Sequence, residues 1–256
     1  MAKRAMSSEQ ASKVKLKGHA REKEFANLIG LDDEYKHDKK AKKDVIDFNG
    51  DGHSVKSGEW WQIFLYSANR IKSDYGFLAM NGMGELILGC LNAFPEKRED
   101  YEKDKDFYKN KLKIPMQALC DKLQNKNRLK AFLSKAIFNG GEVQFLTVFA
   151  ADDLIYIFYF EDVVDILANF LTVENSKARQ SGQFDKQKVL FKYGVNVGEI
   201  EVRNDSIAHY REIKFRFNAA KITNLLKEKI KNYDKFNEKI YRYGKAIKKF
   251  NSKGMK

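Results

Sequence analysis

The chain has few cysteines and few prolines, the residues that cross-link a chain or interrupt its helices and strands. Its 256 residues include only two prolines and two cysteines. The cysteines, Cys90 and Cys120, lie far apart inside apolar segments, so no disulfide framework is indicated and a reducing, cytoplasmic location is expected. Long apolar runs are also missing: no stretch reaches the roughly 18 residues that a membrane-spanning helix needs. The N-terminal segment lacks the apolar centre of a signal peptide.

Acidic residues are outnumbered by basic ones, which leaves a formal net charge of +13. Such an excess predicts contact with a polyanion, and nucleic acid is a better candidate than an anionic membrane surface. High lysine usage also fits an AT-rich genome, so charge alone does not decide. Hydrophobic residues make up 43% of the chain and aromatic residues 13%. This composition is enough for one sizeable core or two small ones.

Hydrophobic periodicity predicts helices mixed with strands. Helices are predicted over 18–29, 59–73, 86–94, 114–138 and 161–171, with a long basic helix or helix pair over 219–250. Strands are predicted over 44–48 and 53–57 around an Asn-Gly-Asp-Gly turn, over 143–149 and 154–160, and in a second hairpin, 198–204 and 211–217. We therefore expect an α/β (α+β) fold, with a central mixed β-sheet flanked by helices.

The segment KKDVIDFNGDGHSVKSG holds the strongest candidate site. Strand alternation puts Ser54 and Lys56 on one face of the second strand, and pairing through the short turn brings Asp44 beside them. The carbonyl of Val55 lies between the two. Carboxylate and carbonyl oxygens suit Mg²⁺, and a lysine beside them can orient water or stabilise developing charge. The same residues also fit a surface hairpin whose polar side chains are only solvated.

This arrangement resembles the PD-(D/E)XK nuclease superfamily, in which an Asp is followed further along by an acid-x-Lys. Here the match is Asp44 and then Ser54-Val55-Lys56, so a serine stands where the second acid is expected. The resemblance implies that Asp44 and the Val55 carbonyl bind Mg²⁺. It also implies that Lys56 and Ser54 belong to the catalytic group.

Two flanking segments extend the resemblance. Upstream, KGHAREKEF is similar to the first-helix motif of archaeal Holliday-junction resolvases, which implies that Glu22 is a metal ligand. Downstream, VKSGEWWQIFLYS resembles the RecB-like nuclease pattern, in which a helix with a Gln-x-x-x-Tyr motif follows the lysine. That pattern implies catalytic roles for Gln62 and Tyr66, four residues apart on one helix face.

Together these resemblances imply a restriction-endonuclease-like fold and a type II site-specific deoxyribonuclease that hydrolyses double-stranded DNA. We expect a homodimer, with a cognate methyltransferase acting on the same site but not necessarily in contact. The expected organisation is one compact domain: a basic arm (1–17), a nuclease core (18–160), and recognition elements with basic C-terminal helices (161–256). Three alternatives remain: a structure-specific repair, recombination or phage nuclease, a nucleic-acid-binding protein that has lost catalysis, and a plain basic structural protein such as a ribosome-associated factor.

Two polar, basic segments are predicted to contact DNA. A two-stranded ribbon can enter the major groove, and the second hairpin carries side chains of the types that read base edges. These residues are Arg203, Asn204, Ser206, His209, Tyr210, Arg211, Lys214 and Arg216. The segment 176–188 adds Arg179 and Gln180. The hairpin also fits an ordinary edge hairpin with a solvated face.

Overall fold

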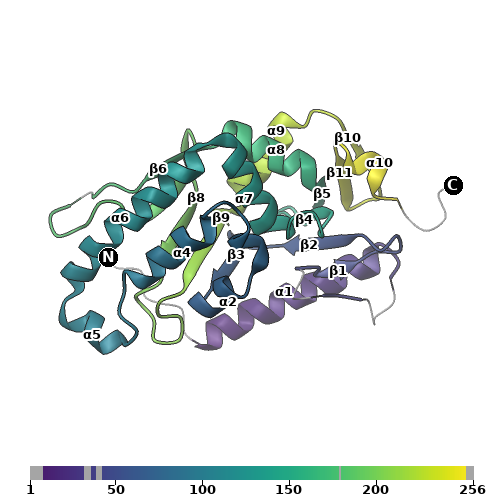
Figure 1. Ribbon diagram of the computed structural model, residues 1–256. Coiled ribbons are helices and arrows are strands. Elements are labelled where there is room, and N and C mark those ends of the chain that lie inside the picture. Colours follow the sequence, from purple (N-terminus) through teal and green to yellow (C-terminus); the bar gives the residue numbers. More distant parts are fainter. Residues whose placement is uncertain (1–7, 32–35, 39–41, 179, 252–256) are drawn as a thin grey trace. The chain divides into compact units, whose positions relative to one another are not determined.

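The computed structural model describes residues 8–31, 36–38, 42–178 and 180–251 (Figure 1). It divides into two compact units. The first unit comprises Met1–Trp61, Ala136–Leu167 and Ala219–Lys256, and the second comprises Gln62–Lys135 and Ala168–Asn218. The predicted α/β (α+β) class is confirmed, but the strands form two sheets where the sequence predicted one.

The first unit contains a mixed sheet of six strands in the order β1-β2-β4-β5-β11-β10. Hairpins β1–β2 and β10–β11 are antiparallel, as is the pair β4–β5, whereas β2–β4 and β5–β11 are parallel. The strands are β1 (Val45–Ile46), β2 (Gly52–Lys56), β4 (Phe145–Phe149), β5 (Ile155–Tyr159), β10 (Tyr233–Lys235) and β11 (Ile240–Tyr243). The predicted strands at 44–48, 53–57, 143–149 and 154–160 are thereby confirmed.

One face of this sheet packs on helix α1 (Ser8–Leu28), which lies along the β1–β2 hairpin (Figure 1). Phe25 on the helix and Ile29 just after it join Val55, Phe145 and Ile157 from the strands in one buried cluster. The helix predicted at 18–29 is confirmed, but the segment predicted as a basic arm is helical from Ser8. Residues 1–7 of that arm lie outside the described residues.

The remaining helices of the described residues range from four residues (α3 and α10) to 20 residues (α6). Helix α9 belongs to the first unit, and α7 and α8 each span a boundary between units in the sequence. The helices are α2 (Ala68–Lys72), α3 (Tyr75–Leu78), α4 (Met83–Asn92), α5 (Arg98–Lys103), α6 (Lys105–Gln124), α7 (Lys126–Phe138), α8 (Phe160–Phe170), α9 (Ala219–Lys229) and α10 (Ala246–Lys249). Helices predicted at 86–94, 114–138 and 161–171 are confirmed by α4, α6, α7 and α8.

The second unit contains a sheet of five strands in the order β3-β9-β8-β7-β6, apart from the first two residues of β3. Its strands are β3 (Trp60–Tyr66), β6 (Thr172–Asn175), β7 (Lys188–Tyr193), β8 (Val195–Val202) and β9 (Ile213–Asn218). The predicted hairpin at 198–204 and 211–217 is confirmed by β8 and β9. Alternate residues of β9, Ile213, Phe215 and Phe217, are buried, as a half-buried strand requires.

Two predicted helices are wrong in part. The segment 59–73 forms strand β3 before the short helix α2, because its run of aromatic and β-branched residues pairs into the sheet. The segment 219–250 is helical over Ala219–Lys229 and again over Ala246–Lys249, but β10 and β11 form a hairpin between these two helices. Tyrosine and isoleucine favour strands there, and β11 gains a parallel partner in β5.

Both cysteines are buried and free, as the sequence predicted. Burial raises the pKa of the Cys90 thiol to about 12 and that of Cys120 to about 11. Among the helices of the described ranges, none is long and apolar enough to cross a membrane.

Candidate active site

Asp44 lies where the pairing of β1 with β2 comes to an end. Its backbone N–H donates to the His53 carbonyl at 2.9 Å, which continues the ladder by one residue. Its side chain then accepts the N–H of Val55 through Oδ2 at 2.8 Å. The carboxylate therefore takes the place that a strand carbonyl would occupy. It is fixed against β2 while staying 22% exposed.

Lys56, the last residue of β2, reaches the same point. Its ammonium nitrogen lies 3.5 Å from Oδ2 of Asp44 and 3.3 Å from the Val55 carbonyl oxygen. The expected juxtaposition of Asp44 with Lys56 is therefore present, with the Val55 carbonyl between them. Within the described part of the chain, Oδ1 of Asp44 has no hydrogen-bond partner, so this oxygen is available to a ligand.

The hairpin that carries this group is anchored in the core and is not a solvated surface feature. His53 is fully buried, with its ring 4.9 Å from that of Phe25 and 4.7 Å from that of Phe145. Its Nδ1 lies 2.8 Å from the Thr147 hydroxyl, and its Nε2 lies 3.4 Å from Asp47. Asp47 also accepts two backbone N–H groups of the turn. Burial lowers the pKa of His53, which favours a neutral ring.

Ser54 and Glu22 approach this group from different sides. Ser54 is almost completely buried and alternates with Val55 across β2. On α1, the Arg21 guanidinium stacks over the Phe149 ring, and Phe149 follows Val148, the partner of Lys56. Further along α1, Phe25 packs on His53, near the start of β2, whereas Arg21 lies beside the end of β2 and β4. Helix α1 therefore runs antiparallel to β2, and Glu22 lies level with the end of β2 that carries Lys56.

Glu22 is partly buried, and its Oε2 lies 3.0 Å from His19 Nδ1. Across the described residues, no hydrogen bond or ion pair connects Glu22 with Asp44 or Lys56. The structure therefore places Glu22 near the same end of β2 as Lys56 without bringing it into contact with Asp44 or Lys56.

The donor set around Asp44 is compatible with Mg²⁺. The described ranges hold no group of three or more His, Cys, Asp or Glu side chains close enough to bind a metal ion. Mg²⁺, however, usually keeps several waters and takes only one or two protein carboxylates together with substrate phosphate. The ammonium of Lys56 already lies between Asp44 Oδ2 and the Val55 carbonyl, so this pair of oxygens accommodates a cation.

Gln62 and Tyr66 lie on strand β3, not on the predicted helix. Because side chains alternate along a strand, a spacing of four residues still puts them on one face. Gln62 is exposed, whereas the Tyr66 ring stacks on Phe64 at 4.8 Å and receives the Arg70 guanidinium at 5.4 Å. Both residues belong to the second unit.

The strands of the second hairpin carry a ladder of opposite charges. Arg216 donates to Glu199 through Nε at 2.9 Å, and Lys188 of β7 reaches the same carboxylate at 3.1 Å. Lys214 lies 3.6 Å from Glu201, its direct partner in the register. The two cations predicted to lie on a free DNA-reading face therefore have acidic partners across the sheet.

Most residues of the loop between β8 and β9 are also engaged within the second unit. Arg203 pairs with Asp205 at 2.8 Å, and His209 Nδ1 lies 2.8 Å from Glu212. The Tyr210 hydroxyl donates to the Pro95 carbonyl, and Arg211 donates to the Leu91 carbonyl. Asn204 and Ser206 are half-buried in the same loop.

The segment 176–188 forms a loop between β6 and β7 and the start of β7. Gln180 is exposed there, and its carbonyl accepts the backbone N–H of Gln183. Arg179 lies outside the described residues. Gln180 and His209 are therefore the predicted DNA-contact residues that are exposed among those whose environment the structure describes.

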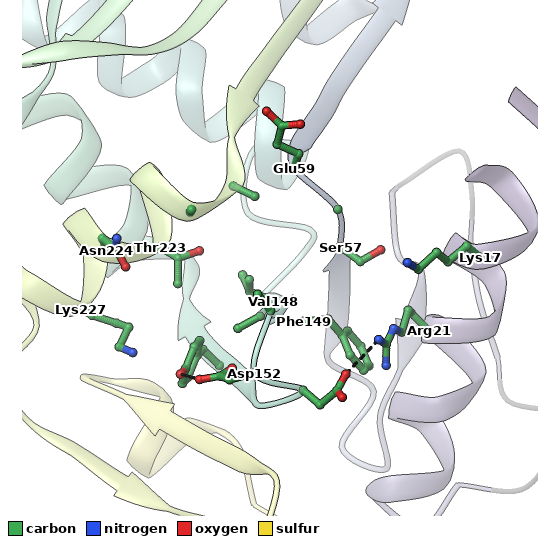
Figure 2. Close-up of a pocket in the computed structure, with 17 residues that line it drawn as sticks. Lys17, Arg21, Ser57, Glu59, Val148, Phe149, Asp152, Thr223, Asn224 and Lys227 are labelled. Carbon is green, nitrogen blue, oxygen red and sulfur yellow. Dashed lines mark hydrogen bonds and ion pairs between the residues drawn. The ribbon is translucent and has the colours of Figure 1, made fainter. Parts of the chain in front are cut away.

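A hollow of about 670 Å³ begins immediately after Lys56 (Figure 2). Ser57, Gly58 and Glu59 form one wall. Lys17 and Arg21 extend into the hollow from α1, and Arg21 pairs with Asp153 of the β4–β5 turn at 3.1 Å. Helix α9 supplies the wall opposite α1 in this view, with Thr223, Asn224 and Lys227.

Sequence reasoning missed this hollow because its walls come from segments far apart in the chain. The available signal was the spacing of Lys17 and Arg21, four residues apart and so on one helix face. The segments 57–59 and 150–153 each follow a strand end, and β2 and β4 are parallel, so both ends lie at one edge of the sheet.

Comparison with protein-family models, with curated proteins and with solved structures finds no match to this chain.

Proposed function

We propose that this chain is a Mg²⁺-dependent endonuclease that hydrolyses phosphodiester bonds in double-stranded DNA. The observation that carries the proposal is the convergence of a carboxylate, a carbonyl and an ammonium group at one strand end. The Lys56 ammonium lies 3.5 Å from the Asp44 carboxylate and 3.3 Å from the Val55 carbonyl. The net charge of +13 supports a polyanionic substrate.

Each residue of this group has a defined chemical task. When bound, Mg²⁺ polarises the scissile phosphate and lowers the pKa of the attacking water. Asp44 and the Val55 carbonyl would hold the ion, and the N–H of Val55 keeps the carboxylate aimed at the strand end. Lys56 places a positive charge where negative charge develops on the phosphate, and a fixed charge there stabilises the transition state.

The buried Ser54 suggests a site for a single ion. A serine hydroxyl is a poorer Mg²⁺ ligand than a carboxylate, and Ser54 is only 1% exposed. Glu22, on α1 near the Lys56 end of β2, is our candidate for a carboxylate that supplements Asp44. We propose one Mg²⁺ ion held chiefly by Asp44, with Glu22 acting through water.

For the biological setting, we propose a type II restriction endonuclease acting as a homodimer, with a methyltransferase that protects the same site. Gln180 is the best supported candidate for base contact, because most residues of the β8–β9 hairpin are engaged internally. A structure-specific nuclease fits the same active-site chemistry. A nucleic-acid-binding protein without cleavage is another candidate, and it is favoured by the serine, Ser54, at the position where the superfamily has its second acid.

The decisive experiment is digestion of a supercoiled plasmid of known sequence, with Mg²⁺ or with EDTA. Mg²⁺-dependent discrete fragments support the restriction enzyme. A smear, or cutting confined to junctions, supports nuclease chemistry but overturns sequence-specific restriction. DNA binding without cleavage under either condition overturns the nuclease and favours the binding protein.

A further inference from the structure

Four tyrosine rings surround a second, shallower hollow of about 350 Å³ in the first unit. We call it the tyrosine basin. Its lining consists of Leu154, Tyr156, Lys227, Ile230, Lys231, Tyr233, Tyr241 and Tyr243. Rings and two lysines dominate it, and the lining includes no acidic side chain among the described residues.

The rings share one face because of the strand register. Tyr233 is directly opposite Tyr243 across β10–β11, and Tyr241 is opposite Tyr156 across β11–β5. Tyr233 stacks on Tyr243 with ring centroids 5.2 Å apart, and Tyr156 meets Tyr243 edge-on at 5.8 Å. Tyr233 remains 59% exposed, so its ring offers free area to a ligand.

The lysines give the basin its charge. The Lys227 ammonium lies 4.1 Å from the centroid of the Tyr156 ring, an arrangement that holds a cation over an aromatic face. Lys231 is exposed two residues before Tyr233. The Tyr156 hydroxyl donates to Asp152 at 3.1 Å, and the Tyr156 ring is 5% exposed beneath Lys227, so it forms the floor of the basin.

We propose that the tyrosine basin binds a single strand of nucleic acid. Unpaired bases stack on aromatic rings whatever their identity, and lysines between the rings contact the phosphates. Tyr156 and Lys227 also line the hollow that begins after Lys56, so the basin and that hollow share a wall. This binding goes beyond the proposed cleavage and holds whether or not the chain cuts DNA.

The test is the binding of fluorescein-labelled oligothymidylate and oligouridylate to the full chain. Fluorescence anisotropy measures this binding, in a buffer that contains EDTA. Tyr233→Ala is expected to weaken binding about tenfold, because one stacked base is lost. Tyr233→Phe keeps the ring and is expected to bind within about twofold of wild type. Lys231→Ala is expected to lower the slope of log Kd against log salt by about 0.7, the value for one phosphate contact on a single strand.

The matched control is Tyr75→Ala, because Tyr75 is 82% exposed and belongs to the second unit. It is expected to bind as wild type does, and circular dichroism checks that each variant is folded. Failure of the wild type to bind either oligonucleotide overturns the proposal. Wild-type affinity in Tyr233→Ala also overturns it, because the rings then only stabilise the hairpin. Since EDTA prevents cleavage, either result leaves the nuclease proposal untouched.

Discussion

The β1–β2 and β8–β9 hairpins carry similar residue types, yet their charges are arranged differently. On β8–β9, Glu199 and Glu201 face Arg216 and Lys214 directly across the strands. On β1–β2, a carboxylate and an ammonium meet only at the strand end, beside a backbone carbonyl. The β8–β9 arrangement neutralises its charges internally, whereas the β1–β2 arrangement leaves one oxygen of the Asp44 carboxylate for a ligand.

The pKa shifts in the β8–β9 charge ladder agree with internal neutralisation of its charges. Burial alone would raise the pKa of Glu201, but Lys188, Lys214 and Arg216 outweigh it and hold that pKa below its usual range. Burial lowers the pKa of Lys214, and the neighbouring Arg216 lowers it further. Opposite charges paired across a sheet contribute to stability, and little of their charge remains for DNA.

The largest expected effect is on catalysis at β1–β2. Asp44→Asn keeps an oxygen for the Val55 N–H but loses the negative charge. Cleavage is expected to fall by roughly a hundredfold, equivalent to about 3 kcal/mol of transition-state stabilisation. Urea unfolding is expected to stay within about 1 kcal/mol of wild type. A variant that instead unfolds readily and cuts normally when folded would make Asp44 a structural residue only.

Glu199→Gln on β8 is expected to lower stability and to leave cleavage unchanged. The Glu199 side chain is 7% exposed and has Lys188 and Arg216 within hydrogen-bonding distance. Both cations are about a third exposed, so water offsets part of the loss, and we expect about 2 kcal/mol less unfolding free energy. Urea denaturation measures this change. Cleavage per folded molecule is expected to match wild type, and a parallel loss of activity would put the ladder in the active site.

A smaller effect is expected when the pH is lowered, because acid reduces the stability of the core around the β1–β2 hairpin. The pKa of His53 is lowered by burial, so the unfolded chain binds a proton more readily than the folded chain. The resulting stability is present above the unfolded pKa, about 6.5, and is lost as the pH falls through the folded pKa. We expect the melting temperature to fall between pH 7.5 and about 5.

The matched histidine variants identify the source of that fall. His209 is half-exposed in the β8–β9 loop, so His209→Asn is expected to keep the wild-type pH dependence. His53→Leu is expected to flatten it, although its stability is lower at every pH. An unchanged slope in His53→Leu would mean that other groups cause the acid sensitivity.

The smallest expected effect is that of the ladder cations on DNA. Lys214→Ala removes a lysine already paired with Glu201, so duplex affinity is expected to change less than about threefold. Anisotropy with a labelled duplex in EDTA measures it. A tenfold loss, with a shallower salt dependence, would restore the β8–β9 hairpin as a DNA-binding surface.

Much of the fold could be predicted from local patterns. The Asn-Gly-Asp-Gly turn and the flanking alternation predicted the β1–β2 hairpin, and the apolar runs predicted β4 and β5. The segment 60–66 could not be assigned this way, because Trp61, Phe64 and Leu65 match a helical stripe as well as a strand. Only pairing with β9 decides between them, and that depends on distant residues.

The candidate site was predictable to a similar degree. Asp44 and Lys56 are joined by a short turn, so their meeting followed from sequence alone. The charge ladder did not, because acids and bases on β7, β8 and β9 face one another only in the register that the fold selects. The tyrosine basin was hidden for the same reason, since 231–243 was predicted to be helical.

The most direct test of the account is the cleavage rate of an end-labelled duplex by wild type, Asp44→Asn and Asp100→Asn at equal concentration. Asp100 forms an exposed ion pair with Lys103 on α5, so Asp100→Asn removes the same charge away from β1–β2. With Mg²⁺, wild type and Asp100→Asn are expected to cut equally, and Asp44→Asn roughly a hundredfold more slowly. Equal rates in all three proteins, or cutting that persists in EDTA, would contradict a Mg²⁺ site at Asp44.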